Sequence, residues 1–171
     1  VFVCAERTEF PAYYVDIDAN NGRGTSEKIK TFDVMIHRRS PSISYRLDKA
    51  AVIDREGWLW DIDFSNVQKP KMTKKKNVKH MRLSGMMTVL PDGRVMLIGG
   101  SGTEEEKGNT LEDAVYDIMI WDPDTNDLHT GAEQDLARLY HSTAFTLPDG
   151  AVVSMGGGAP GPLKNLNGQI Y

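Results

Sequence analysis

The chain has 171 residues and a formal net charge of −4 at pH 7, with 40% hydrophobic and 26% charged residues. These are globular values, and the negative charge argues against a generally basic nucleic-acid binder. Its one cysteine, Cys4, excludes a disulfide within the chain and is expected to be a small buried residue. No apolar run approaches the roughly 18 residues of a spanning helix, so no membrane span is expected. Because the sequence starts with Val1 and not methionine, we expect a piece of a longer protein.

Short segments rich in β-branched, aromatic and apolar residues follow one another, bounded by Gly, Pro, Asp or Asn. No window has the pattern of an amphipathic helix of three turns. The sequence therefore predicts an all-β fold. The expected strands are Val1–Cys4, Tyr13–Ile17, Thr31–Ile36, Ala50–Ile53, Trp58–Ile62, Met86–Leu90, Val95–Ile98, Val115–Trp121, a strand near Leu128, Thr143–Leu147, Ala151–Met155 and Gln169–Tyr171.

Two segments, Leu90–Gly100 and Leu147–Gly157, repeat each other at an offset of 57 residues. Each has a Leu-Pro-Asp-Gly turn, an apolar strand and a glycine pair, and glycine supplies the positive φ that a tight hairpin needs. A repeat of roughly 50 residues is the size of a four-stranded blade of a kelch-type propeller. The glycine pairs lack the spacing of a phosphate-binding loop, so we expect them where blades pack closely.

We therefore predict a partial kelch-type β-propeller of about three blades, a sector of a ring, because propellers close with about four to eight blades. Residues 1–65 are predicted to form one or one and a half degenerate blades. Residues 66–130 are predicted to form a kelch blade, and residues 131–171 to begin the next. Trp58–Asp61 is expected in the slot that Ile120–Asp122 fills one blade later.

Two acidic turns have carboxylates or amides at positions 1, 3, 5 and 12 of a calcium loop, but both lack its glycine at position 6. We expect structural turns, with calcium as the alternative. The residues concerned are Asp16, Asp18, Asn20 and Glu27, and Asp122, Asp124, Asn126 and Glu133.

The segment Lys69–His80 contains six lysines and no acid. A solvated loop between blades is the favoured interpretation, and a polyanion-binding patch is the alternative. His37, His80 and His129 stand alone, without a second ligand at a useful spacing, and are expected in loops or at the surface.

The dipeptide Tyr140-His141 precedes the strand of the second repeat. Neighbouring side chains of a strand point to opposite faces, so both can reach one ion only where the chain bends into the strand. Imidazole suits copper well, and a phenolate can join it. A core tyrosine beside a polar histidine is the alternative.

The motifs around this dipeptide resemble the galactose oxidase and glyoxal oxidase family of copper radical oxidases, from about Met81 to Tyr171. They are Arg138–Ser142, Leu147–Gly150, Gly156–Pro162 and Asn165–Tyr171. The resemblance implies a seven-bladed kelch propeller with one copper ion on its axis and a C-terminal β-sandwich domain after it. By this likeness Tyr140 is the axial copper ligand and the catalytic base, and His141 is an equatorial ligand.

The same likeness implies oxidation of primary alcohols or aldehydes by O2 to give H2O2, by an extracellular or cell-surface enzyme. Its Cys-Tyr radical cofactor and second histidine ligand are expected outside this chain, which alone would be inactive; Cys4, in a second-strand slot, is not expected to be the cross-linked cysteine. Leu83 and Ser84 occupy the Tyr-His positions of the preceding repeat, as expected for a blade without metal. The alternative is a non-catalytic kelch propeller that binds carbohydrate or protein.

Overall fold

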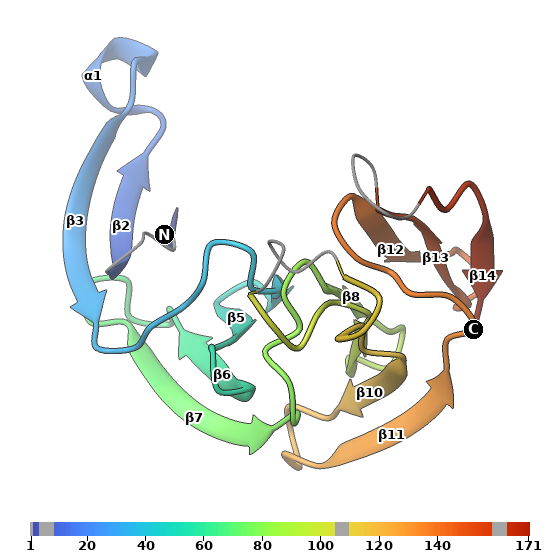
Figure 1. Ribbon diagram of the computed structural model, residues 1–171. Helices are drawn as coiled ribbons and strands as arrows, with labels where there is room; N and C mark the ends of the chain where they lie inside the picture. Colours follow the sequence, from blue (N-terminus) through green and yellow to red (C-terminus); the bar gives the residue numbers. More distant parts are fainter. Residues whose placement is uncertain (1, 4–8, 105–109, 159–163) are drawn as a thin grey trace.

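The computed structural model describes residues 2–3, 9–104, 110–158 and 164–171 (Figure 1). Cys4 and the Ala159–Pro162 part of the glycine-rich motif lie outside the described residues. The described chain forms four antiparallel sheets, and its one helix is the four-residue α1 (Ala19–Gly22). The predicted all-β class is confirmed.

Each sheet is a meander in which strands pair in chain order. The first sheet contains β1 (Phe2–Val3), β2 (Phe10–Asp16) and β3 (Thr25–Phe32). The second contains β4 (Ser42–Arg46), β5 (Lys49–Ile53), β6 (Trp58–Asp63) and β7 (Lys71–Asn77). The third contains β8 (Met86–Val89), β9 (Val95–Ile98), β10 (Asp117–Trp121) and β11 (Leu128–Glu133). The fourth contains β12 (Ser142–Thr146), β13 (Val152–Gly156) and β14 (Gly168–Ile170).

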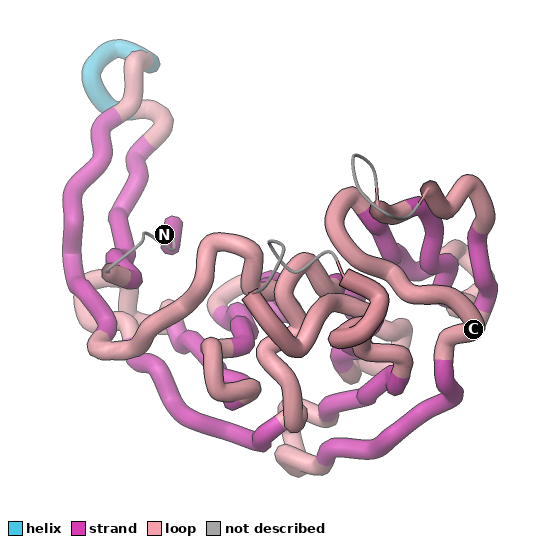
Figure 2. Tube along the Cα trace, in the orientation of Figure 1, coloured by secondary structure: helices cyan, strands magenta, loops and turns pink. Residues whose placement is uncertain are grey.

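The four sheets follow one another along an arc (Figures 1 and 2). Strand β8 lies beside both β4 and β12, so the first strands of consecutive sheets are neighbours. Strands β7 and β11 run along the outer rim of the arc. Each sheet thus has an inner strand near its neighbours and an outer edge strand, as in the blades of a propeller.

The predicted repeat is present in the strand register. Met86 faces Ile98 in the third sheet, and Thr143 faces Met155 in the fourth, at the same offset of 57 residues. Both Pro-Asp-Gly turns are hairpins whose glycines, Gly93 and Gly150, have φ values of 87° and 89°. The predicted turn chemistry is therefore confirmed.

The glycine pair Gly99-Gly100 follows β9, at a point where the segments that precede β8 and β12 pass very close to it. A Cβ atom on Gly100 would lie 2.5 Å from the Arg82 carbonyl oxygen, and one on Gly99 would lie 2.5 Å from that of Arg138. The Gly100 N–H also donates a hydrogen bond to the Arg138 carbonyl, at 2.8 Å. These contacts confirm the prediction that close packing requires glycine here.

A hydrophobic core fills each space between consecutive sheets. Because side chains alternate along a strand, neighbouring residues of the central strands point into different cores. This explains why these strands are apolar without interruption. The first core contains Phe10, Ala12, Phe32, Ala50, Val52 and Ile62; the second contains Ala51, Ile53, Leu59, Val95, Leu97, Met119 and Trp121; the third contains Met96, Ile98, Ile118 and Val152.

The lysine-rich segment is a strand, β7, and the expectation of a loop over Lys69–His80 was wrong for its central part. An outer strand has one hydrogen-bonded neighbour and exposes both faces to water, so it needs no apolar pattern. The same reason explains why most of strand β3 was missed: only Thr31 and Phe32 of the expected strand Thr31–Ile36 belong to it. Strand β4 is the inner strand of the second sheet, and it was missed because its sequence, Ser-Ile-Ser-Tyr-Arg, is mostly polar. The predicted boundary after residue 65 falls between β6 and β7, inside the second sheet.

The second core gives a direct stability prediction. Leu97 is fully buried, whereas Leu47 is fully exposed. Leu97→Ala is expected to lower the free energy of unfolding by about 2–5 kcal/mol, because it leaves a cavity between two sheets. Leu47→Ala, with the same chemical change, is expected to stay within about 0.5 kcal/mol of the wild type. Urea unfolding measures both, and equal effects would contradict the assignment of this core.

Candidate metal site at the start of strand β12

Tyr140 and His141 lie immediately before β12, and their side chains lie together. The two rings are stacked, with centroids 3.8 Å apart and planes inclined by 27°. His141 has a φ of 66°, in the left-handed region, so the backbone does not alternate here as it would in a strand. The chain therefore bends at the dipeptide and brings the phenol and the imidazole to the same side.

The segment before β8, in the preceding sheet, has the same backbone arrangement but carries neither a phenol nor an imidazole. The Gly158 N–H donates to the Tyr140 carbonyl at 2.6 Å, and 57 residues earlier the Ser101 N–H donates to the Leu83 carbonyl at 2.9 Å. Ser84, in the place of His141, has a φ of 60°. The bend is thus a feature of both repeats. Of the two copies, only the one before β12 carries a phenol and an imidazole.

Arg39 completes the cluster from a distant part of the sequence. Its guanidinium carbon lies 4.7 Å from the centroid of the Tyr140 ring, within the range of a cation–π contact. Arg39 precedes β4, and its carbonyl accepts a hydrogen bond from the Ser84 N–H, at 2.8 Å. The segments before the first strands of three consecutive sheets therefore meet at Tyr140. The sequence analysis missed Arg39, because its partner, Tyr140, is far away in the sequence and no local pattern marks the contact.

His37 lies beside this cluster with a defined ring state. Its Nδ1 accepts a hydrogen bond from the Arg39 backbone N–H, at 3.1 Å, so Nδ1 is unprotonated. Burial lowers the pKa of His37 below its ordinary value of 6.5; Glu104 acts in the opposite direction, and Arg55 and the two neighbouring arginines add to the lowering. Glu104 is itself paired with Arg55, at 3.0 Å. His37 thus lies among three arginines, of which Arg39 is the one that also contacts Tyr140.

Two buried arginines hold the ends of the second strands. The Arg138 Nη1 donates to the Gly156 carbonyl at 2.9 Å, and the Arg82 Nη1 reaches the Gly99 carbonyl at 3.4 Å. Both side chains are completely buried. Arg82 Nη2 also lies 3.1 Å from an Asp117 carboxylate oxygen. These contacts fix the backbone on which the bend before β12 depends.

The stacked dipeptide offers two donors to a metal ion. Tyr140 offers a phenol oxygen and His141 an imidazole nitrogen. Within the residues that the structure describes, no group of three or more His, Cys, Asp or Glu side chains is arranged to hold a metal ion. A complete metal site at this position would need further ligands.

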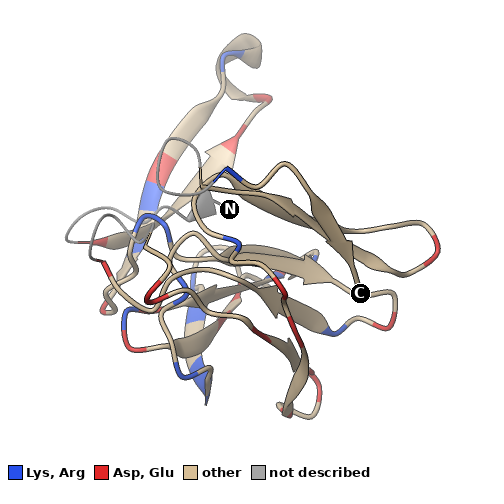
Figure 3. Ribbon diagram, turned by 45° about the vertical axis from the view of Figure 1, so that its right-hand side comes forward, with Lys and Arg blue, Asp and Glu red and all other residues tan. Residues whose placement is uncertain are grey.

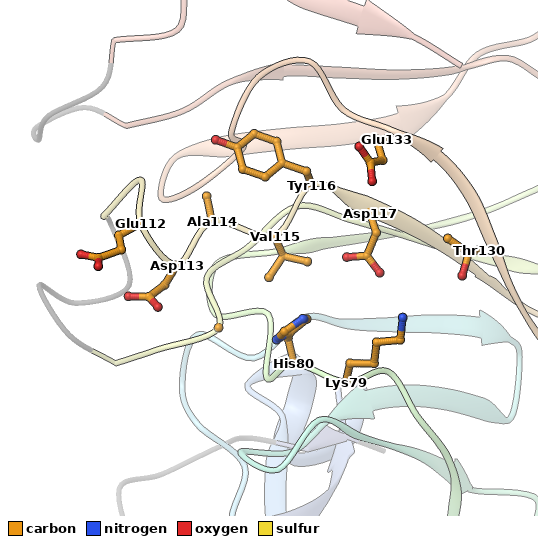
Figure 4. A pocket seen from close by; sticks show the side chains of 11 residues that line it. Lys79, His80, Glu112, Asp113, Ala114, Val115, Tyr116, Asp117, Thr130 and Glu133 are labelled. Carbon is orange, nitrogen blue, oxygen red and sulfur yellow. The ribbon is translucent and has the colours of Figure 1, made fainter.

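A second hollow, of about 530 Å³, lies away from this cluster (Figure 4). Lys79 and His80 line one side of it, and Tyr116 and several carboxylates line the other. His80 is exposed in a loop, as the sequence predicts, and neither Tyr140 nor His141 borders the hollow. This hollow therefore does not extend the candidate metal site.

The two acidic turns use carboxylates to satisfy their own backbone. Asp122 Oδ1 accepts hydrogen bonds from the N–H groups of Asp124 and Thr125, at 2.8 and 3.2 Å. Asp16 Oδ1 likewise accepts hydrogen bonds from the N–H groups of Asp18 and Ala19, at 3.0 and 3.1 Å. These are the contacts of Asx turns, which favours the structural interpretation over calcium binding.

The fold identifies the class of protein. A solved structure titled as a novel fungal alcohol oxidase of the AA5 family, in complex with copper, superposes with a TM-score of 0.78 over 96% of this chain and 36% of its own, at 20% identity. The structure of YjhT superposes with a TM-score of 0.55 over 70% of this chain and 34% of its own, at 15% identity. The chain is a partial kelch-type β-propeller.

The sequence comparisons are more specific. Two proteins named galactose oxidase, both from Gibberella zeae, are 35% identical to this chain over 87 residues, which is 48% of this chain and 12% of the relatives. No family model matches the sequence. The predicted resemblance to the galactose oxidase family is therefore confirmed for about half of the chain. The chain spans about an eighth of the length of these curated relatives. No helix among the described residues is long and apolar enough to span a membrane.

The ring state of His37 leads to a prediction on pH. Since its pKa is lowered on folding, the folded chain binds fewer protons than the unfolded chain as pH falls below 6.5. Its contribution to stability is therefore complete above pH 6.5 and is lost as pH falls from there toward the folded pKa. An NMR titration of the His37 ring should give a lower midpoint in the folded chain than in urea. A midpoint equal to or above the unfolded one would contradict the described environment.

Proposed function

We propose that this chain is the metal-ligand-bearing part of a galactose oxidase-like copper radical oxidase, in which Tyr140 and His141 bind the copper ion. The observation that carries the proposal is the left-handed bend at His141, which stacks the imidazole on the phenol and leaves both on one side of the chain. Tyrosine and histidine are suitable ligands for copper. The similarity to proteins named galactose oxidase supports this choice of metal.

The proposed reaction removes two electrons and two protons from a primary alcohol or an aldehyde hydrate and reduces O2 to H2O2. When bound, copper would accept one electron, and a radical on a cross-linked tyrosine expected outside this chain would accept the other. Tyr140 Oη, as phenolate, accepts the proton of the substrate hydroxyl, and nearby positive charge favours that form. His141 holds the metal next to this oxygen.

Arg39 supports the same step without being a ligand. Its charge lies over the Tyr140 ring, where it stabilises negative charge on the phenolate and keeps the ring in place. The contact also ties the segment before β4 to the segment before β12. We therefore assign Arg39 as a positioning residue for the proposed base.

The remaining parts of the proposal follow from the family resemblance. They are a second histidine and a Cys-Tyr radical cofactor outside this chain, a C-terminal β-sandwich domain, and an extracellular or cell-surface location. The chain alone would be inactive, because two donors do not complete a copper site. Glyoxal and other small aldehydes belong to the proposed substrate class together with primary alcohols.

A non-catalytic kelch module that binds carbohydrate or protein is the second candidate. It is favoured because, among the described residues, no three His, Cys, Asp or Glu side chains are grouped to hold a metal ion. In that case Tyr140 and His141 would be a remnant on the repeated bend. The two functions differ in whether the full-length protein binds copper.

Copper titration of the full-length protein tests the assignment. Tyr140→Phe and His141→Ala are each expected to weaken copper binding at least about tenfold, because loss of groups that merely support a ligand already costs 10- to 100-fold. His129→Ala, which removes an exposed histidine on β11, is the matched control and should leave the affinity unchanged. Unchanged copper affinity in both site variants, by calorimetry, would refute the proposal.

Arg39 is tested by the turnover rate in a peroxide-coupled assay. A cation–π contact contributes about 0.5–2 kcal/mol, so Arg39→Gln should lower kcat roughly 2- to 30-fold while copper affinity changes little. Arg39→Lys keeps the charge and should recover part of the rate. A normal kcat in Arg39→Gln would show that the contact has no role in the reaction.

A further inference from the structure

The outer strand β7 carries a concentration of positive charge that neither the core nor the proposed metal site explains. Lysines occupy positions 69, 71, 74, 75 and 76, in a chain whose net charge is −4. All but Lys75 are exposed. Among the described strands, β7 pairs with β6 alone, and it lies on the outer rim of the arc (Figure 1). Figure 3 shows the lysines and arginines of the chain in blue.

Within the described part of the chain, most of these lysines have no acidic partner. Lys75 lies 3.7 Å from the Asp61 carboxylate, which is the one ion pair of the group among the described residues. Lys69, Lys71 and Lys76 form no ion pair with any described residue. Lys74 lies over the Trp58 ring, 4.1 Å from its centroid, which holds the ammonium group at the surface.

Protection of the sheet edge does not account for this composition. Lysine on an edge strand prevents pairing with other chains, and a few charges suffice. Strand β11 is the equivalent outer strand of the third sheet and is just as exposed, yet its sequence, Leu-His-Thr-Gly-Ala-Glu, contains no lysine. Strand β3 has two lysines, but Lys28 is paired with Glu9 at 2.7 Å and Lys30 donates to the Pro70 carbonyl at 3.1 Å.

The chemistry of the strand favours a linear, anionic polysaccharide over nucleic acid or lipid. Seven residues of strand extend over roughly 23 Å, and the strand register places Lys71 and Lys74 on opposite faces, so the charges flank the outer edge of the sheet on both sides. Nucleic acid would need a free aromatic face for its bases, but Lys74 already lies against Trp58 and within 5.7 Å of Trp60. A membrane would need exposed apolar side chains, and within residues 69–76 Pro70 is buried and Met72 half-buried.

We propose that strand β7 is a binding surface for a linear polysaccharide with repeated carboxylate or sulfate groups. The exposed lysines bind successive anionic groups, and the polymer lies along the open edge of the second sheet. The surface is separate from Tyr140 and His141 and does not depend on the copper proposal. It would attach the protein to an acidic matrix while the axial site stays free.

The test measures binding of the full-length protein to heparin and to polygalacturonate, with neutral dextran as the control polymer. Binding is expected at low salt, and it should weaken at least tenfold between 20 and about 200 mM NaCl, because several lysines displace counterions. The triple variant Lys71→Gln, Lys74→Gln and Lys76→Gln should lose at least tenfold in affinity. Its melting temperature should fall by a few degrees at most, since all three side chains are exposed and the lost contact of Lys74 with Trp58 contributes little at an exposed site.

The matched control is a triple variant away from β7, Arg23→Gln, Lys28→Gln and Lys164→Gln, which changes the net charge by the same amount. Compared at about 150 mM NaCl, it should lose less than about twofold, because charges farther away than the Debye length of about 8 Å are largely screened. Equal losses in the two triple variants, or no binding of either polymer by the wild type, would overturn the proposal. Tighter binding to single-stranded DNA or to anionic vesicles would overturn the choice of polysaccharide. Preference for heparin or polygalacturonate decides between sulfate and carboxylate.

Discussion

The alternation of side chains along the central strands is the constraint on which the structure depends. In β5 and β9 each residue points into a different core from the next, so one strand supports packing on both faces of its sheet. These cores hold each sheet to its neighbours, and Leu97 and Met96, adjacent in sequence, stabilise two different interfaces. Close packing of the sheets also requires glycine at the end of β9, because neighbouring backbone passes too close to Gly99 and Gly100 to leave room for a side chain. Packing between sheets thus fixes the backbone before the next inner strand.

The candidate site uses that fixed backbone. The bend before β12 also exists before β8, where Leu83 and Ser84 take the positions of Tyr140 and His141. A scaffold that forms the bend for structural reasons can change the side chains on it without altering the sheets. The left-handed conformation of His141 costs free energy in a non-glycine residue, and the hydrogen bond between Gly158 and Tyr140 helps to hold it.

The fold was largely predictable because the repeat from Leu90 to Gly100 carries its own turn and packing signals. Strand β7 was missed because an outer strand is not required to be apolar, and its lysines have the composition of a loop. The position of Tyr140 and His141 at a bend was predictable from their place before a strand. Arg39 was not, because its contact with Tyr140 arises from the arrangement of the sheets and leaves no local pattern in the sequence. Local signals therefore locate the ligands, and tertiary structure alone locates their neighbours.

The separation of Arg39 and Tyr140 in sequence has a consequence for how the protein folds. The meander sheets are made of local pairings and can each form early, whereas the arginine reaches the phenol only after the second, third and fourth sheets have docked in order. The contact between Arg39 and Tyr140 thus reports that three sheets have assembled correctly. A chain with one sheet misplaced would keep most of its secondary structure and yet lack the cation over the Tyr140 ring.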